Sequence, residues 1–475
     1  MRIILTTSLM LGFYCLCAQE WQQVGNFNKS PRTLFTDTVD NILYIGGDFR
    51  FNGSDTVNGV CRLQGNAIQP MGTGFYAACG NNVCNPILSF IRYKNEIYSG
   101  AYFNEIAGVP SSGIVRWDGS NWYPITPFLY NVNSNAGFIS GSCVYNNLLY
   151  VVGTFKFAGN KEANSVASWD GVQWTTFGFP DDISAVYYGA PFNFRVAYYK
   201  NELYVCGEFY NIINDSSNFN IARYDGNTWK QVGGGLSPVL SSIHDMVVYH
   251  DELYIAGIFS TSEGNPGNKI MRWDGTAWHD VGKGVCGSGS IYDMLVYNDK
   301  LYVAGSFNCI SDSLLLENVA VWDGQHWCSV GNSRFDNGDV TSIAVYNDEI
   351  YIGGEFTNID DQPVKYFAKY IGDHSKDTCA ALVAVKNTPA PSGQLSISPN
   401  PASGSIRLLV ADETTAIQAI AFYDVAGRDC TGLTNLPASS APTTATIDIH
   451  RLPAGLYHVR VQYAEKVFIG RFVKI

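Results

Sequence analysis

The sequence predicts an all-β chain in which a seven-bladed β-propeller, its last blade closed by the N-terminal strand, precedes a small Ig-like β-sandwich. Three observations predict this fold. A phrase of the form Leu/Ile-Tyr-x-x-Gly-x-Phe recurs seven times, aromatic residues follow it at fixed distances, and the 475-residue chain contains 47 Gly but only 15% charged residues. A repeat of roughly 50 residues is typical of a four-stranded propeller blade.

Each repeat is expected to begin with a β-hairpin. The repeated phrase has its tyrosine at Tyr44, Tyr98, Tyr150, Tyr204, Tyr254, Tyr302 and Tyr351. Three residues before each tyrosine stands Asn or Asp, which tolerate the positive φ of a tight turn. The glycine three residues after the tyrosine is replaced only once, by Ala101. We therefore expect an inner strand, a tight turn and a second strand in every blade.

The third and fourth strands of the blades carry large side chains in fixed places. The third strands end at Leu63, Trp117, Trp169, Tyr224, Trp273, Trp322 and Tyr370. The fourth strands begin at Ile68, Trp122, Trp174, Trp229, Trp278 and Trp327. Between them, five blades have an Asp-Gly turn, in which the Asp side chain is expected to cap the turn. The aromatic residues are expected to fill the space between neighbouring blades.

The seventh repeat lacks a fourth strand. Its third strand ends at Tyr370, after which the repeat stops, and the only unmatched fourth-strand phrase is Trp21–Gly25 near the beginning of the chain. An open sheet edge promotes aggregation, and closing a ring removes that edge. We therefore expect Trp21–Gly25 to form the outer strand of blade seven.

Residues from about 20 to 372 resemble the kelch repeat, in which glycines end the second strand and a Tyr and a Trp follow in fixed order. The resemblance implies a propeller and specifies no ligand. The double glycine of that family is present only at Gly46-Gly47 and Gly353-Gly354, which limits the resemblance to architecture.

The ends of the chain differ from the repeats. Residues 1–18 combine an early Arg with an apolar run and small residues, the pattern of a secretory signal peptide. Residues 374–394 have the Pro, Ser and Gly content of a linker, and short alternating strands follow in 395–475. The expected order is signal peptide 1–18, propeller 19–373, linker 374–394 and terminal domain 395–475. No later stretch is apolar enough to span a bilayer.

The terminal domain closely resembles the C-terminal sorting domain of type IX secretion cargo in Bacteroidetes. The matching residues are Pro399, Asn400, Pro401, Asp424, Gly427, Arg428, Pro453, Gly455, Tyr457 and Lys474. The resemblance implies that the type IX secretion machinery reads this domain and exports the chain to the cell surface or the medium. It also implies that the domain is cleaved off during export. An ordinary adhesive sandwich is the alternative.

The composition excludes several classes of function. The formal net charge of -12 provides no basic surface for nucleic acid. The histidines before the linker, His244, His250, His279 and His326, are not spaced as metal ligands. The sequence contains neither a nucleophile elbow nor a phosphate-binding glycine loop. We therefore expect no metal, no cofactor and no catalytic residue.

Three connections between blades are longer than the others and are expected to lie on one face. Loops on a rigid scaffold commonly carry function. The candidate ligand-binding residues in these loops are Phe75, Tyr76, Phe128, Tyr130, Asp181, Asp182, Tyr187, Tyr188 and Phe192. Aromatic rings among polar residues suit a sugar or a protein surface. The alternative is that these aromatic residues pack the long loops against the blades.

The predicted function is therefore binding of an extracellular glycan or protein, without catalysis, by a secreted or cell-surface protein. A secreted glycan hydrolase or lyase that uses Asp181, Asp182 or Glu105 with a tyrosine is the first alternative. A structural component of the cell surface is the second.

The cysteines agree with an extracellular location, where disulfides are stable. Cys79 and Cys84 are close enough in the sequence to form one loop disulfide. Cys143 and Cys206 fall at apolar strand positions, where buried free thiols are expected.

Overall fold

The computed structural model describes residues 20–372 and 395–475 with short gaps. The gaps are 76–77, 80–81, 84–86, 102–104, 107–108, 132–135, 181–193, 211–218, 235, 237–241, 262–265, 287–288, 312–315, 332–333, 336–337, 411–418, 425–429, 435–443 and 464–465. The chain divides into two compact units, Met1–Cys379 and Ala380–Ile475. The expected signal peptide and linker lie outside the described residues.

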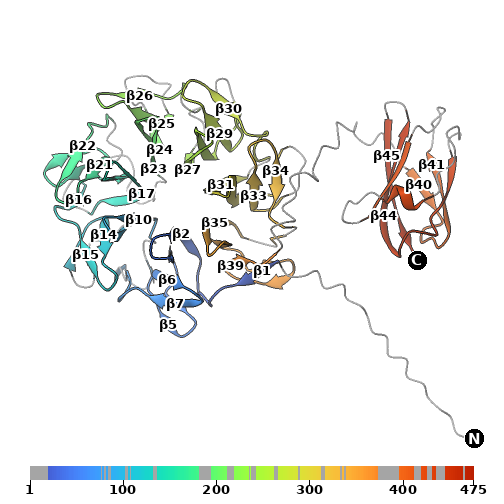
Figure 1. The fold of residues 1–475 in the computed structure, drawn as a ribbon, viewed down its shortest axis with the longest axis horizontal. Helices are drawn as coiled ribbons and strands as arrows, with labels where there is room; N and C mark the ends of the chain where they lie inside the picture. The colour runs from blue at the N-terminus through green and yellow to red at the C-terminus, as the bar shows by residue number, and fades with distance from the viewer. Residues whose placement is uncertain are drawn as a thin grey trace, which may run out of the picture. The chain divides into compact units, whose positions relative to one another are not determined.

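The described part of the first unit contains seven four-stranded antiparallel sheets, which form a propeller-like ring (Figure 1). From the centre outward, blades one to three are β2(Pro31–Asp37), β3(Ile42–Gly47), β6(Val60–Gln64) and β7(Ala67–Pro70); β10(Ser89–Tyr93), β11(Glu96–Gly100), β14(Ile114–Trp117) and β15(Trp122–Pro124); and β17(Phe138–Tyr145), β18(Leu148–Thr154), β21(Val166–Trp169) and β22(Trp174–Thr176).

Blades four to seven repeat the same order of strands. They are β23(Arg195–Tyr199), β24(Glu202–Tyr210), β25(Phe219–Tyr224) and β26(Trp229–Gln231); β27(Ser242–Tyr249), β28(Glu252–Ile258), β29(Ile270–Trp273) and β30(Trp278–Asp280); β31(Ser290–Tyr297), β32(Lys300–Ser306), β33(Val319–Trp322) and β34(Trp327–Ser329); and β35(Val340–Tyr346), β36(Glu349–Gly354), β39(Phe367–Tyr370) and β1(Trp21–Gln23). The prediction of an all-β, propeller-like unit is confirmed.

The N-terminal strand closes the last blade, as predicted. β1 pairs antiparallel with β39, and Trp21 lies opposite Tyr370. The pairing continues on both sides of the strand: the Val24 N–H donates to Phe367 O over 2.9 Å, and the Ile371 N–H donates to Glu20 O over 2.7 Å. Trp21 is fully buried and contacts Tyr370 edge to face, with ring centroids 5.2 Å apart.

The turns between the first two strands have the predicted backbone. The repeated Asn or Asp has positive φ in all seven blades, at Asn41, Asn95, Asn147, Asn201, Asp251, Asp299 and Asp348. In blades two to seven the residue before it also has positive φ, as at Lys200 with 46°. Two consecutive residues of positive φ define the tight turn that matches the twist of a hairpin. These short turns lie together on one face of the ring, which we call the turn face.

The repeated glycine of the second strand faces an irregularity in the inner strand. In blades one, three, five, six and seven the inner strand has a β-bulge opposite this glycine. A Cβ on Gly305 would overlap the backbone oxygen of Ser290, and a Cβ on Gly257 would overlap that of Ser242. Blade two pairs its first two strands without a bulge. Blade four also lacks the bulge and keeps its glycine, Gly207.

The hydrophobic core of the first unit lies between neighbouring blades. One cluster joins Tyr254 of β28 to Trp322 and Trp327 of the next blade, and equivalent clusters repeat around the ring. Trp327 also donates its indole N–H to Val281 O over 3.0 Å. The corresponding bonds run from Trp122, Trp174, Trp229 and Trp278 to the preceding blade. The tryptophans therefore fill the space between blades, as predicted.

The second unit consists of two small antiparallel sheets. One contains β40(Leu395–Ser398), β41(Ser405–Val410) and β43(Thr444–Asp448), and the other contains β42(Ala419–Asp424), β44(Gly455–Tyr463) and β45(Lys466–Lys474). A short 3-10 helix, η5(Thr431–Leu433), follows β42. Both sheets contribute to one core, which includes Ile406, Phe422 and Phe472.

Candidate functional site

The long connections and the loops between second and third strands lie on one face, which we call the loop face. Blade three gives the evidence. β16(Leu129–Tyr130) belongs to the connection that enters this blade, and it pairs with β19(Phe157–Ala158), which belongs to its second-to-third loop. β20(Lys161–Glu162) completes a three-stranded sheet. The two kinds of loop therefore meet.

Short strands occur in other loops of this face. They are β4(Phe51–Asn52), β5(Asp55–Thr56), β8(Ala78–Cys79), β9(Asn82–Val83), β12(Glu105–Ile106), β13(Val109–Pro110), β37(Asn358–Ile359) and β38(Gln362–Pro363). All of them form two-stranded hairpins. In blade three the two kinds of loop share a sheet, whereas in blades one, six and seven single β-bridges join them.

Two stacked aromatic rings lie on the small sheet of blade three. The rings of Tyr130 and Phe157 are 5.2 Å apart at an interplanar angle of 26°, and both side chains are partly exposed. The Lys156 N–H donates to Tyr130 O over 3.0 Å and fixes the spacing of the two strands. The Lys156 ammonium lies 3.0 Å from a carboxylate oxygen of Glu162. We call Tyr130 and Phe157 the aromatic shelf.

The described candidate residues outside the shelf have different surroundings. Phe75 is 7% exposed, and its ring packs edge to face on Trp122 at 4.6 Å. This is the packing that the alternative interpretation predicts. Phe128 is partly exposed, and its carbonyl accepts the Gly159 N–H over 2.9 Å. The structure thus brings Phe128 and Tyr130 together on blade three.

Several predicted residues cannot be placed in this way. Tyr76, Asp181, Asp182, Tyr187, Tyr188 and Phe192 lie outside the described residues. Glu105 lies on β12 and Cys79 on β8, but their side chains, like Cys84, lie outside the described part. The predicted Cys79–Cys84 disulfide therefore stays a prediction.

The cysteines contain one pair that the sequence did not predict. Cys286, in the connection that enters blade six, forms a disulfide with Cys309, in the second-to-third loop of that blade. The Cys286 N–H also donates to Cys309 O over 3.2 Å. Cys206 is a buried free thiol and Cys143 a partly buried one, as expected. Cys328 is also disulfide-bonded.

Three charged side chains link the inner strands of blades four to seven. Arg195 Nε lies 3.3 Å from Asp245 Oδ1. Asp245 Oδ2 accepts the Met294 N–H of the next blade over 2.8 Å, and Asp293 Oδ2 accepts the Ile343 N–H of the following blade over 2.8 Å. The Met294 N–H also lies 3.1 Å from Asp293 Oδ1, so both carboxylates converge on one amide. We call Arg195, Asp245 and Asp293 the inner-strand link.

This link occupies one position of the repeat. The residues opposite the second position after the repeated tyrosine are Thr33, Ser89, Gly141, Arg195, Asp245, Asp293 and Ser342. Burial and the Asp245 carboxylate raise the pKa of Asp293 to about 7. Burial also raises the pKa of Asp245, and Arg195 opposes that change. The described partners of these three side chains include groups of neighbouring blades, so the link joins blades.

The described histidines of the first unit also have protein partners. Nδ1 of His244 lies 3.1 Å from Ile291 O, and burial lowers the pKa of this imidazole to about 4. His250 Nε2 lies 2.7 Å from a carboxylate oxygen of Asp299. Among the residues that the structure describes, no group of three or more His, Cys, Asp or Glu side chains could hold a metal ion.

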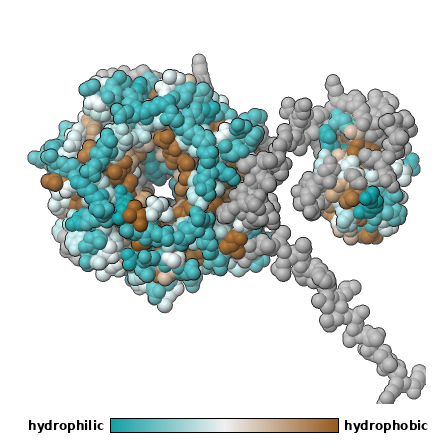
Figure 2. Space-filling model, viewed as in Figure 1, coloured by the Kyte–Doolittle hydropathy of each residue, from teal (hydrophilic) through white to brown (hydrophobic). Residues whose placement is uncertain are grey.

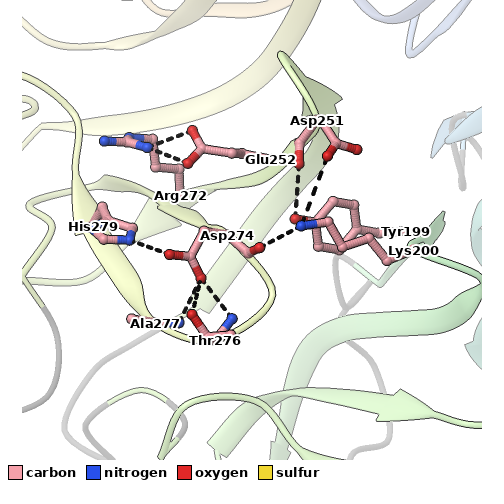
Figure 3. Close-up of polar contacts among 9 residues, drawn as sticks. All are labelled: Tyr199, Lys200, Asp251, Glu252, Arg272, Asp274, Thr276, Ala277 and His279. Carbon is pink, nitrogen blue, oxygen red and sulfur yellow. Dashed lines mark hydrogen bonds and ion pairs between the residues drawn. The ribbon is translucent and has the colours of Figure 1, made fainter.

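The turn face is a regular network of polar contacts, which Figure 3 shows for blades four and five. Lys200 donates to Asp274 O over 2.6 Å, and Tyr199 donates to Asp251 O over 2.9 Å. Asp274 Oδ1 accepts two backbone N–H groups of its own turn, and His279 contacts its other oxygen at 2.7 Å. These bonds hold the pKa of Asp274 far below its usual range.

The same turn geometry recurs at four other aspartates. Asp118, Asp170, Asp225 and Asp323 each accept two backbone N–H groups of their turn. The prediction that the Asp-Gly aspartates cap turns is confirmed. These carboxylates are therefore structural.

The centre of the ring differs from its outer part. In the view of Figure 2 the outer part is mainly hydrophilic, whereas hydrophobic residues gather around the central opening. Val144, Val248 and Val296 occupy equivalent positions of three inner strands, and each is 41% exposed. Part of the apolar surface of the inner strands therefore remains accessible.

The predicted motif residues of the second unit hold its chain ends. Tyr457 is buried and donates its hydroxyl hydrogen to Pro453 O over 2.9 Å. Asn400 binds the last strand through its side chain. Gly455 begins β44, Lys474 ends β45, and the two residues lie opposite each other in the antiparallel pair. Asp424 ends β42, its side chain outside the described part, and Gly427 and Arg428 lie outside it altogether.

Comparison with known families gives two matches. Residues 396–475 match the family model described as "Secretion system C-terminal sorting domain". The chain carries a secretion sorting domain. The sorting domain directs the protein, through the type IX secretion machinery, to the cell surface or the extracellular space. Residues 201–227 match a second model, "Domain of unknown function (DUF5122) beta-propeller". The protein is therefore a propeller protein exported by type IX secretion.

Solved structures that resemble the chain include the WD40 repeats of RRP9, U3-55K and one designed protein. The WD40 repeats of RRP9 cover 74% of this chain and 97% of their own, at 10% identity and a TM-score of 0.43. U3-55K covers 74% of this chain and 99% of its own, at 10% identity and a TM-score of 0.43. The computationally designed Ika8 protein covers 73% of this chain and 98% of its own, at 8% identity and a TM-score of 0.39.

Among curated proteins, none matches the chain. No helix in the described ranges is both long and apolar enough to cross a membrane.

Proposed function

We propose that the protein binds an extracellular glycan, without catalysis, on the loop face around blades two to four. The aromatic shelf carries this proposal, because Tyr130 and Phe157 present stacked, partly exposed rings on a sheet built from two loops. Aromatic rings bind the apolar face of a sugar, and nearby charged and amide groups bind its hydroxyls. Lys156 and Glu162 supply such groups at the edge of the same sheet.

The rest of the proposed surface extends from the shelf. Phe128 is adjacent to it in sequence and partly exposed. We include Tyr76, Asp181, Asp182, Tyr187, Tyr188 and Phe192 because the sequence assigns them to the connections that enter blades two and four. Phe75 supports the surface from beneath, since its ring is buried against Trp122.

We also infer a finer architecture. Seven four-stranded sheets, with a glycine opposite each of the five inner-strand bulges, support a seven-bladed kelch-like propeller. Two three-stranded sheets around one core support an Ig-like sandwich for the sorting domain. The resemblance to type IX cargo implies that this sandwich is removed after export.

A glycan array probed with the purified protein tests the binding proposal. Tyr130→Ala should reduce retention on the bound glycan at least about fivefold, because loss of one stacking face removes about 1–3 kcal/mol. The double variant Tyr187→Ala/Tyr188→Ala should reduce it as well. Tyr123→Ala is the matched control, because Tyr123 is a 37% exposed tyrosine on the outer strand of blade two.

Three results would contradict the proposal. Binding that is equal in the Tyr130 and Tyr123 variants would exclude the shelf. Capture of an extracellular protein with no glycan retained would replace the glycan with a protein ligand. New reducing ends or unsaturated products in incubations with polysaccharide would identify an enzyme instead.

A further inference from the structure

The last strand of the sorting domain has an edge that its own sheet leaves unpaired. β45 is an outer strand in the order β42-β44-β45, so only one of its sides is bonded to β44. Unpaired strand edges recruit other strands unless the protein covers them. Over the final residues of the chain, a turn at Pro399–Ala402 provides that cover.

Four hydrogen bonds join this turn to the chain end. The Asn400 amide donates through Nδ2 to Arg471 O over 3.2 Å, and Asn400 Oδ1 accepts the Val473 N–H over 2.9 Å. The Ala402 N–H donates to Val473 O over 2.8 Å, and Ala402 O accepts the Ile475 N–H over 2.9 Å. Ala402 is 1% exposed and forms a parallel bridge with Lys474.

The Asn400 side chain imitates a strand peptide. In a parallel ladder, one residue bonds to the two residues that flank its partner. Ala402 does so around Lys474, and the side-chain amide of Asn400 does so one step earlier, around Phe472. Pro399 and Pro401 have no backbone N–H. The side-chain amide therefore supplies the donor that the prolines cannot.

The turn holds residues whose side chains remain accessible. Val473 is 38% exposed and Ile475 is 65% exposed. The Lys474 ammonium donates to Ile475 O over 2.7 Å. A chain end of this kind frays unless its backbone is bonded. The bonds to Asn400 and Ala402 thus keep a cationic and apolar surface in a fixed extended conformation.

We propose that Asn400 is a positioning residue for export: it clasps β45 so that Val473–Ile475 are presented to the secretion machinery in one conformation. The proposal rests on the sorting role of this domain and is independent of glycan binding by the first unit. It gives the Pro-Asn-Pro motif a physical role, because Asn400 carries the only side-chain amide of the turn and this amide bonds to both Arg471 and Val473.

The test compares three variants of the full chain. Asn400→Ala removes both bonds, Asn400→Asp keeps the acceptor for Val473 and loses the donor to Arg471, and Ser396→Ala is the control. Ser396 is exposed on β40 of the same domain. Hydrogen exchange of the purified chains, and the fraction exported from a type IX-secreting bacterium, are measured in parallel.

Asn400→Ala should accelerate exchange of the Val473 and Ile475 amides about fivefold or more, since one hydrogen bond contributes about 1 kcal/mol. Amides of Val459 and Val461 in β44 should be unchanged, and export should fall by at least half. Asn400→Asp should have the same two effects at a smaller size. Ser396→Ala should have neither.

Two outcomes would overturn the proposal. One is normal export of Asn400→Ala despite faster exchange at Val473 and Ile475. The other is faster exchange at Val459 and Val461 in both Asn400 variants, which would make Asn400 a general stabiliser of the fold. Failure of glycan binding, by contrast, would leave export of every variant as it is.

Discussion

At the scale of single residues, the least expected feature is the inner-strand link. Asp245 and Asp293 converge on the Met294 N–H, and one arginine, Arg195, lies beside them. Two carboxylates at one amide repel each other when both are charged, and partial burial adds to the cost. The link therefore makes the stability of blades five and six depend on protonation.

We predict that the free energy of unfolding has a component that decreases as pH rises. The folded-state pKa of Asp293 is about 7, above the ordinary value for Asp. Stability from its proton is therefore fully present below about pH 4 and is lost as pH rises through 7. Urea unfolding at pH 5 and pH 8 should show this component in the wild type, and Asp293→Asn should lack it.

The expected difference between these proteins at pH 8 is about 1–3 kcal/mol in favour of Asp293→Asn, because one pKa unit corresponds to about 1.4 kcal/mol. Asp323→Asn, in a turn cap, serves as the control and should follow the wild type. Equal pH dependence of all three proteins would refute this role of Asp293.

At the scale of elements, the disulfide of blade six fastens two loops of the loop face. Cys286 and Cys309 are separated by 23 residues. Replacing both by Ala should lower the free energy of unfolding by about 3 kcal/mol, because the unfolded chain gains the entropy of that loop. Denaturation of the double variant checks this. Cys206→Ala, which removes a free thiol, should leave a reductant-sensitive transition in place.

The closing strand β1 should contribute as much to the free energy of unfolding as a segment of the core. Trp21 is fully buried between Tyr370 and Phe335. Trp21→Ala should lower the free energy of unfolding by about 3–5 kcal/mol. Val172→Ala is the control, because Val172 is 79% exposed. If thermal melting of the two variants were equal, β1 would be a dispensable addition to a ring held by the other strands.

At the scale of the whole molecule, the two units divide the work. The first unit has its own interblade cores and the sorting domain has its own core. We predict that a chain ending at Gly372 folds with the same melting temperature for its propeller unit and is not exported. Calorimetry and fractionation of cells check the two parts. If the shortened chain lost both the folding of the propeller unit and export, the two units would not be independent.

The sequence predicts most of this architecture because the same turn residues and the same large side chains recur in almost all of the seven repeats. The missing fourth strand of blade seven identified the partner of Trp21, and the Asn or Asp before each tyrosine identified the turns. The inner-strand link could not be predicted, since the residue type at this position of the repeat differs between blades, from Thr33 in blade one to Ser342 in blade seven. Only the register across two blades shows that Asp245 and Asp293 meet.

The candidate site was predicted less completely for a related reason. Side chains in long loops have no periodicity that separates a ring packed inward from one left exposed. Phe75 packs into the core whereas Tyr130 lies on the shelf, although both occur in aromatic, glycine-containing connections. The Cys286–Cys309 pair required knowledge that two loops of blade six approach each other.

The pairing of β1 with β39 has a consequence for the order of events during synthesis. During synthesis, β1 stays unpaired until nearly the whole propeller sequence, up to β39, has been made. Contacts between such distant segments form late, because loop closure must come first. Until Tyr370 has been synthesised, the edges of β1 and of the incomplete blade seven both remain unpaired, and unpaired strand edges promote aggregation.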